Sequence, residues 1–112
     1  MPPPGWTRTS TPKARVAPST PDLHWAAGFI EGEGCFTTSP GSQRVVVGQT
    51  QREPLERLAE LFGGSVVPMK QKGLGKKPMF KWAVYGSRAR GVSWTLYPLL
   101  STARQTQIRK VA

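Results

Sequence analysis

The sequence predicts a single α+β domain: a four-stranded antiparallel sheet with helices on one face, in the order helix, two strands, helix, two strands, helix. Three observations lead to this fold class. Apolar residues recur at helical spacing in EPLERLAELF, between Pro54 and a Gly63-Gly64 stop. They alternate at strand spacing through Val45 and Val47. The length of 112 residues is enough for one domain and hardly for two.

Residues 1–20 are predicted to be a disordered basic tail, and residues 21–112 to form the domain. The tail is rich in Pro, Ser, Thr and Arg and has no hydrophobic period, so it cannot bury enough apolar surface to fold. Thr20 is the expected N-cap of the first helix, with Pro21 and Asp22 suited to its first turn. This helix is expected to run through LHWAAGFIEGEG and to end at Gly32 or Gly34.

The other elements follow in order along the chain. CFTTS and RVVVGQTQ are predicted strands joined by a turn at residues 40–42, and SVVPMKQK and PMFKWAVYG form a second hairpin after the second helix. Pro68 has no backbone N–H, so its strand is expected at the sheet edge or at a bulge. Beyond Ser87 the chain is expected to be helical, with a break near Pro98.

The charge distribution points to a polyanionic partner. Sixteen Lys and Arg stand against six Asp and Glu, giving a formal net charge of +10, and no acidic residue follows Glu60. Nucleic acid is therefore the first partner to expect, since phosphates neutralise such an excess. An anionic membrane surface comes second, and a purely solubilising role third.

The sequence also indicates the cellular compartment. It has no apolar run of about 20 residues, the length needed to span a bilayer, and no apolar stretch typical of a secretory signal. Its single cysteine, Cys35, cannot form an internal disulfide. We therefore expect an intracellular protein, in the cytoplasm or nucleoid. Abundant Ala, Arg, Gly and Pro with no Asn favour a GC-rich genome, such as that of a phage.

The end of the first helix carries the most unusual residues. Gly28 and Gly32 lie four residues apart, hence on one helical face, although each glycine costs a helix about 1 kcal/mol relative to alanine. Such a face lets another backbone approach closely. Glu31 and Glu33 follow at the helix foot, where hard carboxylate oxygens suit Mg²⁺. The alternative is that both are solvated charges at a frayed helix end.

The same stretch resembles a known family. Residues 26–34, AAGFIEGEG, resemble the LAGLIDADG motif of homing endonucleases, with Glu31 and Glu33 at its acidic positions. Cys35 and Phe36 fit the small-then-aromatic continuation, and LERLAELFGGSV resembles the family's second helix. The resemblance covers roughly residues 22–108. It implies the αββαββα fold of the single-motif members, whose function is linked to intron or intein mobility.

The resemblance also implies a mechanism. Motif helices of two subunits would pack through Gly28 and Gly32, which form the expected dimer interface. Each subunit would deliver Glu33 to a Mg²⁺ site between them, where the cations activate water for attack on the scissile phosphate and stabilise the attacking and leaving oxygens. The expected activity is double-strand DNA cleavage by a homodimer, on a target made near-palindromic by the two-fold axis.

Further site residues follow from the resemblance. Glu31 would mainly hold helix ends by hydrogen bonding. Gln49 matches the position that orients water around the metal, and a strand-end polar residue is its alternative interpretation. Arg104 is the best match for the basic residue near the last helix, where the family favours Lys. Arg52 is a weaker supporting candidate, with a salt bridge to Glu56 as the competing interpretation.

Family members lay the open sheet face in the DNA major groove, and strand alternation predicts which residues point there. Arg44 is the best candidate for a bidentate guanine contact, whereas the lysines are expected to hold phosphates or to be ordinary solvated charges. The predicted DNA-binding residues are Thr37, Ser39, Arg44, Thr50, Lys70, Lys72, Lys76, Lys77, Lys81 and Tyr85.

Two other functions compete with this one. The chain could keep the LAGLIDADG fold without cutting, as a DNA-binding regulator or an RNA splicing maturase. RNA would be a partner only in the maturase case. It could also be a small basic RNA-binding structural protein. That function explains the charge, but gives no reason for two glycines and two acids at one helix foot.

Overall fold

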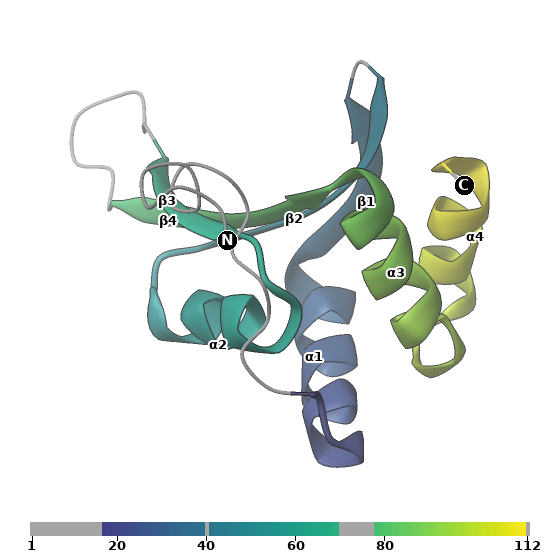
Figure 1. Ribbon diagram of the computed structural model, residues 1–112, viewed down its shortest axis with the longest axis horizontal. Coiled ribbons are helices and arrows are strands. Elements are labelled where there is room, and N and C mark those ends of the chain that lie inside the picture. Colours follow the sequence, from purple (N-terminus) through teal and green to yellow (C-terminus); the bar gives the residue numbers. More distant parts are fainter. Residues whose placement is uncertain (1–16, 40, 70–77, 112) are drawn as a thin grey trace, which may run out of the picture.

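The protein folds as one four-stranded antiparallel sheet with its helices on one side (Figure 1). The structure is a computed structural model that describes residues 17–39, 41–69 and 78–111. The predicted α+β class and element order are confirmed. In chain order the elements are α1 (Thr20–Glu33), β1 (Gly34–Ser39), β2 (Ser42–Gln49), α2 (Glu53–Phe62), β3 (Ser65–Met69), β4 (Met79–Tyr85), α3 (Gly86–Leu96), a 3-10 turn (Tyr97–Leu99) and α4 (Thr102–Val111).

The sheet has the strand order β1-β2-β4-β3, with β2 and β4 in the centre. Val45 pairs with Val84, and Val47 with Trp82, so these buried side chains share the face that the helices cover. β3 is an edge strand, as expected from Pro68. On the side of β3 that faces no other strand, the missing N–H of a proline breaks no hydrogen bond. The predicted helix break near Pro98 is also confirmed, as the 3-10 turn between α3 and α4.

Trp82 anchors the core beneath the sheet. It is fully buried, and its indole Nε1 donates a hydrogen bond of 2.9 Å to the carbonyl oxygen of Gly63. Gly64 follows with φ +95, where a Cβ would lie 2.7 Å from the Ala83 carbonyl oxygen. The Gly63-Gly64 exit of α2 is therefore needed for close packing of the chain against β4.

The start of α1 differs by one residue from the prediction. Ser19, not Thr20, is the N-cap: its hydroxyl accepts a hydrogen bond from the Asp22 backbone, and the Asp22 carboxylate accepts one from the Ser19 backbone. This reciprocal pair is a capping box, which requires an acid at the third helical position. Counting back three residues from Asp22 identifies Ser19.

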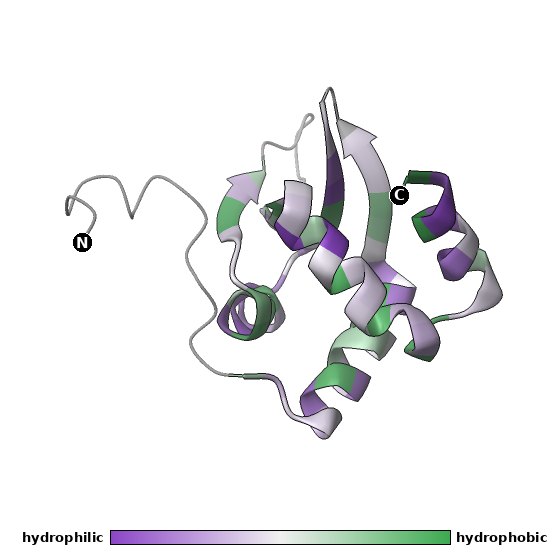
Figure 2. Ribbon diagram, turned by 45° about the vertical axis from the view of Figure 1, so that its right-hand side comes forward, coloured by the Kyte–Doolittle hydropathy of each residue, from purple (hydrophilic) through white to green (hydrophobic). Residues whose placement is uncertain are grey.

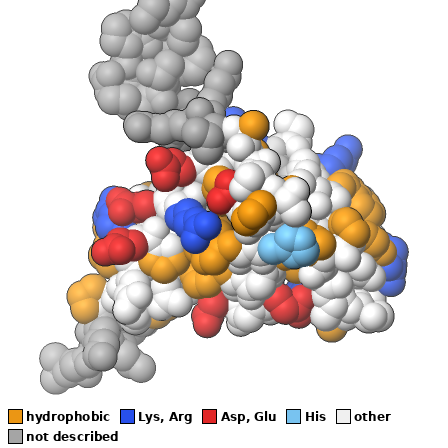
Figure 3. All heavy atoms as spheres, turned by 90° about the horizontal axis from the view of Figure 1, so that it is seen from below, with side chains coloured by type: hydrophobic (Ala, Val, Ile, Leu, Met, Phe, Trp, Pro, Cys, Tyr) orange, Lys and Arg blue, Asp and Glu red, His pale blue; other side chains and the backbone are white. Residues whose placement is uncertain are grey.

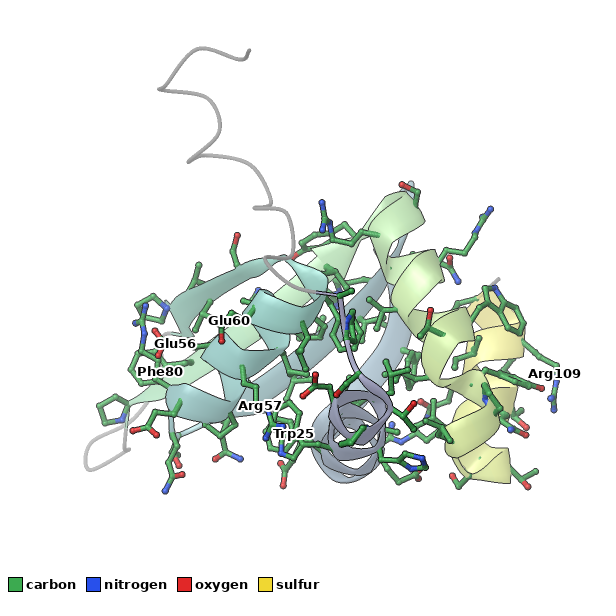
Figure 4. The ribbon with its side chains drawn as sticks, turned by 60° about the horizontal axis from the view of Figure 1, so that its bottom comes forward. Trp25, Glu56, Arg57, Glu60, Phe80 and Arg109 are labelled. Carbon is green, nitrogen blue, oxygen red and sulfur yellow. The ribbon has the colours of Figure 1, made fainter. Side chains whose placement is uncertain are left out.

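The helices differ in how they meet the rest of the fold. Arg57 of α2 lies over the ring of Trp25 in α1, with its guanidinium carbon 4.0 Å from the ring centroid (Figure 4). α4 lies beside β1 and is mostly hydrophilic, with Ile108 as its buried residue (Figure 2). No helix in the described part of the chain is both long and apolar enough to cross a membrane.

Candidate functional site

The chain passes from α1 into β1 without a loop. Glu33 is the last residue of the helix, and Gly34 is the first of the strand. The Gly34 N–H donates to the Ile30 carbonyl oxygen, and a Cβ on Gly34 would lie 2.6 Å from the Ile30 side chain. A glycine is needed here because Ile30 fills the core directly beside it. The last turn of α1 is thereby fixed against the sheet.

Glu31 joins the foot of α1 to the start of α4. Its carboxylate accepts hydrogen bonds from the Ser101 backbone N–H at 2.8 Å and from the Ser101 hydroxyl at 2.7 Å. Its backbone carbonyl accepts two more from the Arg104 guanidinium, at 2.8 and 3.1 Å. Ser101 precedes the first residue of α4, where unpaired N–H groups favour a carboxylate. Glu31 thus lies where the predicted helix-holding role requires.

These contacts stabilise the ionised form of Glu31. Hydrogen bonds from the Ser101 backbone and hydroxyl lower the pKa of its carboxyl group, with a smaller contribution from the positive charge of Arg104. Partial desolvation acts in the opposite direction and does not outweigh them. Folding therefore favours loss of the Glu31 proton.

We predict that Glu31→Gln lowers the free energy of unfolding at neutral pH by about 1 kcal/mol, a value discounted because the side chain is partly exposed. Since the folded pKa lies below the ordinary value of 4.5, the contribution is complete above that pH. It is lost as the pH falls through the folded pKa. Denaturant unfolding at stepwise lower pH should show the wild-type advantage disappear. Glu60→Gln, on an exposed residue of α2, should show no such pH-dependent difference, and an equal difference at every pH would contradict the prediction.

Glu33 differs from Glu31 in having no partner. It is exposed, and it makes no hydrogen bond or salt bridge with any other described residue. Glu33 directly precedes Gly34, which pairs with Val47 near the end of β2. The two acids of the motif are therefore divided: one is fixed within the fold and the other is free to bind a ligand.

The other predicted site residues fall into two groups. Gln49 ends β2, and its side-chain oxygen accepts hydrogen bonds from the backbone and hydroxyl of Thr50 at 2.8 and 3.2 Å. Arg104 lies at the foot of α1, where it binds Glu31. Arg52 instead forms a salt bridge to Glu56 at 3.1 Å and lies over the ring of Phe80. The observed contact of Arg52 is therefore the salt bridge to Glu56 that was the alternative to a role in the site.

The open face of the sheet has the predicted side chains. Thr37, Arg44 and Tyr85 form one row across β1, β2 and β4. Lys81 lies on the same face, paired with Gly48, and the Val46–Ala83 pair separates it from this row. Ser39 ends β1 opposite Ser42. Thr50 is a correction: β2 ends at Gln49, so Thr50 follows the strand and does not belong to its outward face. The predictions at Lys70, Lys72, Lys76 and Lys77 lie outside the described residues.

This face is free of negative charge. None of the four strands contains an acidic residue, whereas α1 and α2 contain all six. Figure 3 shows acidic side chains on the opposite side, which the helices form. Arg44 contributes an unpaired donor, since its buried Nε has no hydrogen-bond partner among the described residues. A buried donor without a partner is costly unless a ligand supplies one.

Apolar side chains complete the open face, and the predicted set did not include them. Val67 and Met69 of the edge strand β3 are 40% and 38% exposed. Met69 and Met79 both come within 4 Å of the place where a Cβ on Gly48 would lie. The sequence signal for them is strand parity, since Val67 pairs with Lys81 and Met69 with Met79 on the open face. Thymine methyl groups are the apolar contacts available in a major groove.

Gly28 and Gly32 lie on the uncovered side of α1. Both are exposed, and a Cβ on either one would meet no atom within 4 Å. The protein's own packing therefore does not explain the two glycines. Opposite them, Ala26, Ala27 and Ile30 are the buried residues of the helix.

The arrangement of sheet and helices defines the fold of the LAGLIDADG homing endonucleases. It matches the homing endonuclease I-CvuI bound to the I-CreI target in 2 mM Mg, where the DNA is not cleaved, with a TM-score of 0.55 and 22% identity over 78% of this chain and 60% of that one. It also matches I-CvuI bound to its own target in 2 mM Ca, with a TM-score of 0.56 and 21% identity over 80% of this chain and 66% of that one.

The comparisons establish the fold. The chain spans about 60% of the length of the first of these neighbours. No protein-family model and no curated protein sequence matches it.

Proposed function

We propose that this protein is a metal-dependent DNA endonuclease that acts as a homodimer on a near-palindromic double-stranded target. The observation that carries the proposal is the free Glu33 carboxylate at the foot of α1, beside a sheet face without acids. Both similar structures are homing endonucleases bound to DNA targets, which supports a phosphodiester substrate for this chain.

The available ligands fit Mg²⁺. No group of three or more His, Cys, Asp or Glu side chains that could hold a metal occurs in the described part of the chain. One subunit therefore offers Glu33 but no protein cage. Mg²⁺ suits such a site because it retains waters and takes only one or two carboxylates together with substrate phosphates. A second subunit packed along Gly28 and Gly32 would bring a second Glu33 close to the first.

Each side chain at the helix foot has a distinct task in this proposal. Glu33 holds the metal, and bound Mg²⁺ supplies activation of water and neutralisation of charge on the phosphate. Gln49 is held through its oxygen by Thr50, which leaves its amide nitrogen to donate to water or phosphate. The Glu31 carboxylate binds Ser101, and the Glu31 carbonyl oxygen binds Arg104. These contacts hold the backbone at the foot of α1 in place, and so keep the position of Glu33 fixed.

The face of the sheet supplies DNA recognition. Arg44 has the planar donor arrangement for guanine, Thr37 and Tyr85 flank it on the neighbouring strands, and Lys81 lies farther along the same face. Val67 and Met69 are suited to thymine methyl groups. Lysines between β3 and β4 would add phosphate contacts that set position without sequence preference.

The test is incubation of the purified protein with a randomised duplex library in Mg²⁺ and, in parallel, in Ca²⁺. Cut products in Mg²⁺, enriched for one near-palindromic sequence, would support the proposal. Enrichment of such a sequence without cutting would instead indicate the non-cutting regulator. Equal retention of DNA and RNA with no sequence preference would overturn both DNA-specific functions.

A further inference from the structure

A pocket lies away from the foot of α1, where the turn between β1 and β2 meets the start of α3. It has a volume of about 250 Å³ and is lined by residues 41–43 together with Gly86, Ser87 and Arg90. Because a water molecule takes about 30 Å³ in the liquid, the pocket has room for a phosphate group and several waters. None of its lining residues is acidic.

The N-terminus of α3 forms one wall of this pocket. α3 has 11 residues, and its N-cap, Tyr85, provides no side-chain hydrogen bond to the first turn. The first turn contains no acidic residue. The first N–H groups of any helix lack partners within the helix, and they carry the positive end of its dipole. Gly86 and Ser87, the first two residues of α3, line the pocket, so the start of this helix lies beside it.

Gln43, on the other wall of the pocket, has a hydrogen-bond donor that is unpaired within the described part of the chain. Its side chain is only 8% exposed, and its amide nitrogen Nε2 has no hydrogen-bond partner among the described residues. Its amide oxygen accepts a bond of 3.4 Å from Arg90 Nε, which fixes the amide in the pocket wall. A buried N–H donor without an acceptor is destabilising. The pocket thus has a surplus of donors on two walls and needs an acceptor between them.

We infer that this pocket binds the oxyanion of a phosphate group, held by the first-turn N–H groups of α3, by Gln43 and by the positive charge of Arg90. Helix N-termini with free N–H groups bind phosphate in this way. The pocket lies at the end of the sheet that Gly86 adjoins, on the side of Gln43, whose strand parity is that of the covered residues Val45 and Val47. A phosphate of DNA that passes this end of the sheet is the expected occupant. That assignment rests on the proposed function, since a free phosphate ion has the same chemistry.

The inference is tested with Ser87→Asp, a variant whose effect on folding and whose effect on binding have opposite signs. A carboxylate in the first turn of α3 should stabilise the helix, yet it should repel phosphate. Thr20→Asp makes the same charge change in the first turn of α1 and is the matched control. Two probes are used: inorganic phosphate, followed through the amide NMR signals of Gly86 and Ser87, and a duplex of random sequence, whose affinity is measured over a range of salt concentrations.

The expected results for the duplex follow from counterion release. Ser87→Asp should weaken duplex binding by roughly tenfold, as for loss of one charge-assisted hydrogen bond. It should also reduce the slope of log affinity against log salt by about 0.9 per subunit. Thr20→Asp should leave the slope unchanged, and duplex should shift the Gly86 and Ser87 amide signals of the wild-type protein.

Each of the other outcomes contradicts one specific part of the inference. If inorganic phosphate shifts these signals while Ser87→Asp leaves the duplex slope unchanged, the site takes free phosphate and the DNA assignment is wrong. If neither probe shifts them, there is no phosphate site. Failure of the endonuclease is a separate result: a protein that binds duplex through this pocket but never cuts in Mg²⁺ would refute the proposed function and leave this inference standing.

Discussion

Replacement of Glu33 by glutamine is expected to abolish DNA cleavage while leaving the fold and the DNA affinity nearly unchanged. The amide retains the size of the side chain but loses the anionic oxygens that a hard cation requires. Metal ions supply several kcal/mol of transition-state stabilisation, so the cleavage rate should fall by at least about 10³-fold. Since Glu33 is exposed and has no described partner, unfolding should show little change. Cleavage is measured in Mg²⁺ under single-turnover conditions.

Glu60→Gln is the matched control for this experiment. Glu60 is another exposed glutamate, on α2 and away from the foot of α1 (Figure 4). It should cut DNA at the wild-type rate, because the substitution removes the same charge without touching the proposed site. A Glu33→Gln variant that cuts as fast as this control would remove the central residue of the mechanism.

Leucine at Gly28 or Gly32 is expected to stabilise the subunit and to separate the dimer. Each glycine costs α1 about 1 kcal/mol relative to a good helix former, and neither position has a neighbour that a side chain would strike. Unfolding of the isolated subunit should therefore require more denaturant. A partner helix packed against the same glycines would be forced away in both subunits at once. The dimer dissociation constant should rise at least about 100-fold.

Gly91→Leu provides the control for this pair of effects. Gly91 lies inside α3, is exposed and has no atom within 4 Å of an added Cβ, so it should show the same gain in helix stability. The Gly91→Leu variant should keep the wild-type dimer in sedimentation experiments and the wild-type rate of double-strand cleavage. If Gly28→Leu and Gly32→Leu behave like Gly91→Leu in both assays, the two glycines do not form the dimer interface.

Local patterns in the sequence were sufficient for the elements and for the faces of the strands. The side-chain period of two places Val45 and Val47 on the opposite face from Arg44 wherever the sheet packs, and the structure has them so. Pro68 identified an edge strand for a similar reason, because a missing N–H restricts where a strand can pair. The N-cap of α1 was misplaced by one residue, since Ser19 and Thr20 are both acceptable caps and only the reciprocal bond with Asp22 separates them.

The resemblance to a nine-residue motif located the two acids but not the difference between them. Glu31 and Glu33 are two residues apart, and nothing local distinguishes their carboxylates. Their environments differ because Ser101 and Arg104 arrive from seventy residues farther along the chain and bind only Glu31. Likewise, the sequence left Arg52 either a supporting role in the site or a salt bridge to Glu56. The first turn of α2 brings Glu56 beside it, and the salt bridge forms.

The sequence by itself thus determined which residues form helices and strands, which side of each strand meets the core, and where acidic, basic and small residues gather. These properties depend on neighbours within a few positions along the chain. The tertiary structure decided which acid is bound and which is free, and that Gln43 and Arg90 line one pocket with the start of α3. Those outcomes depend on contacts between distant segments, whose choice of partner is fixed only when the whole core packs.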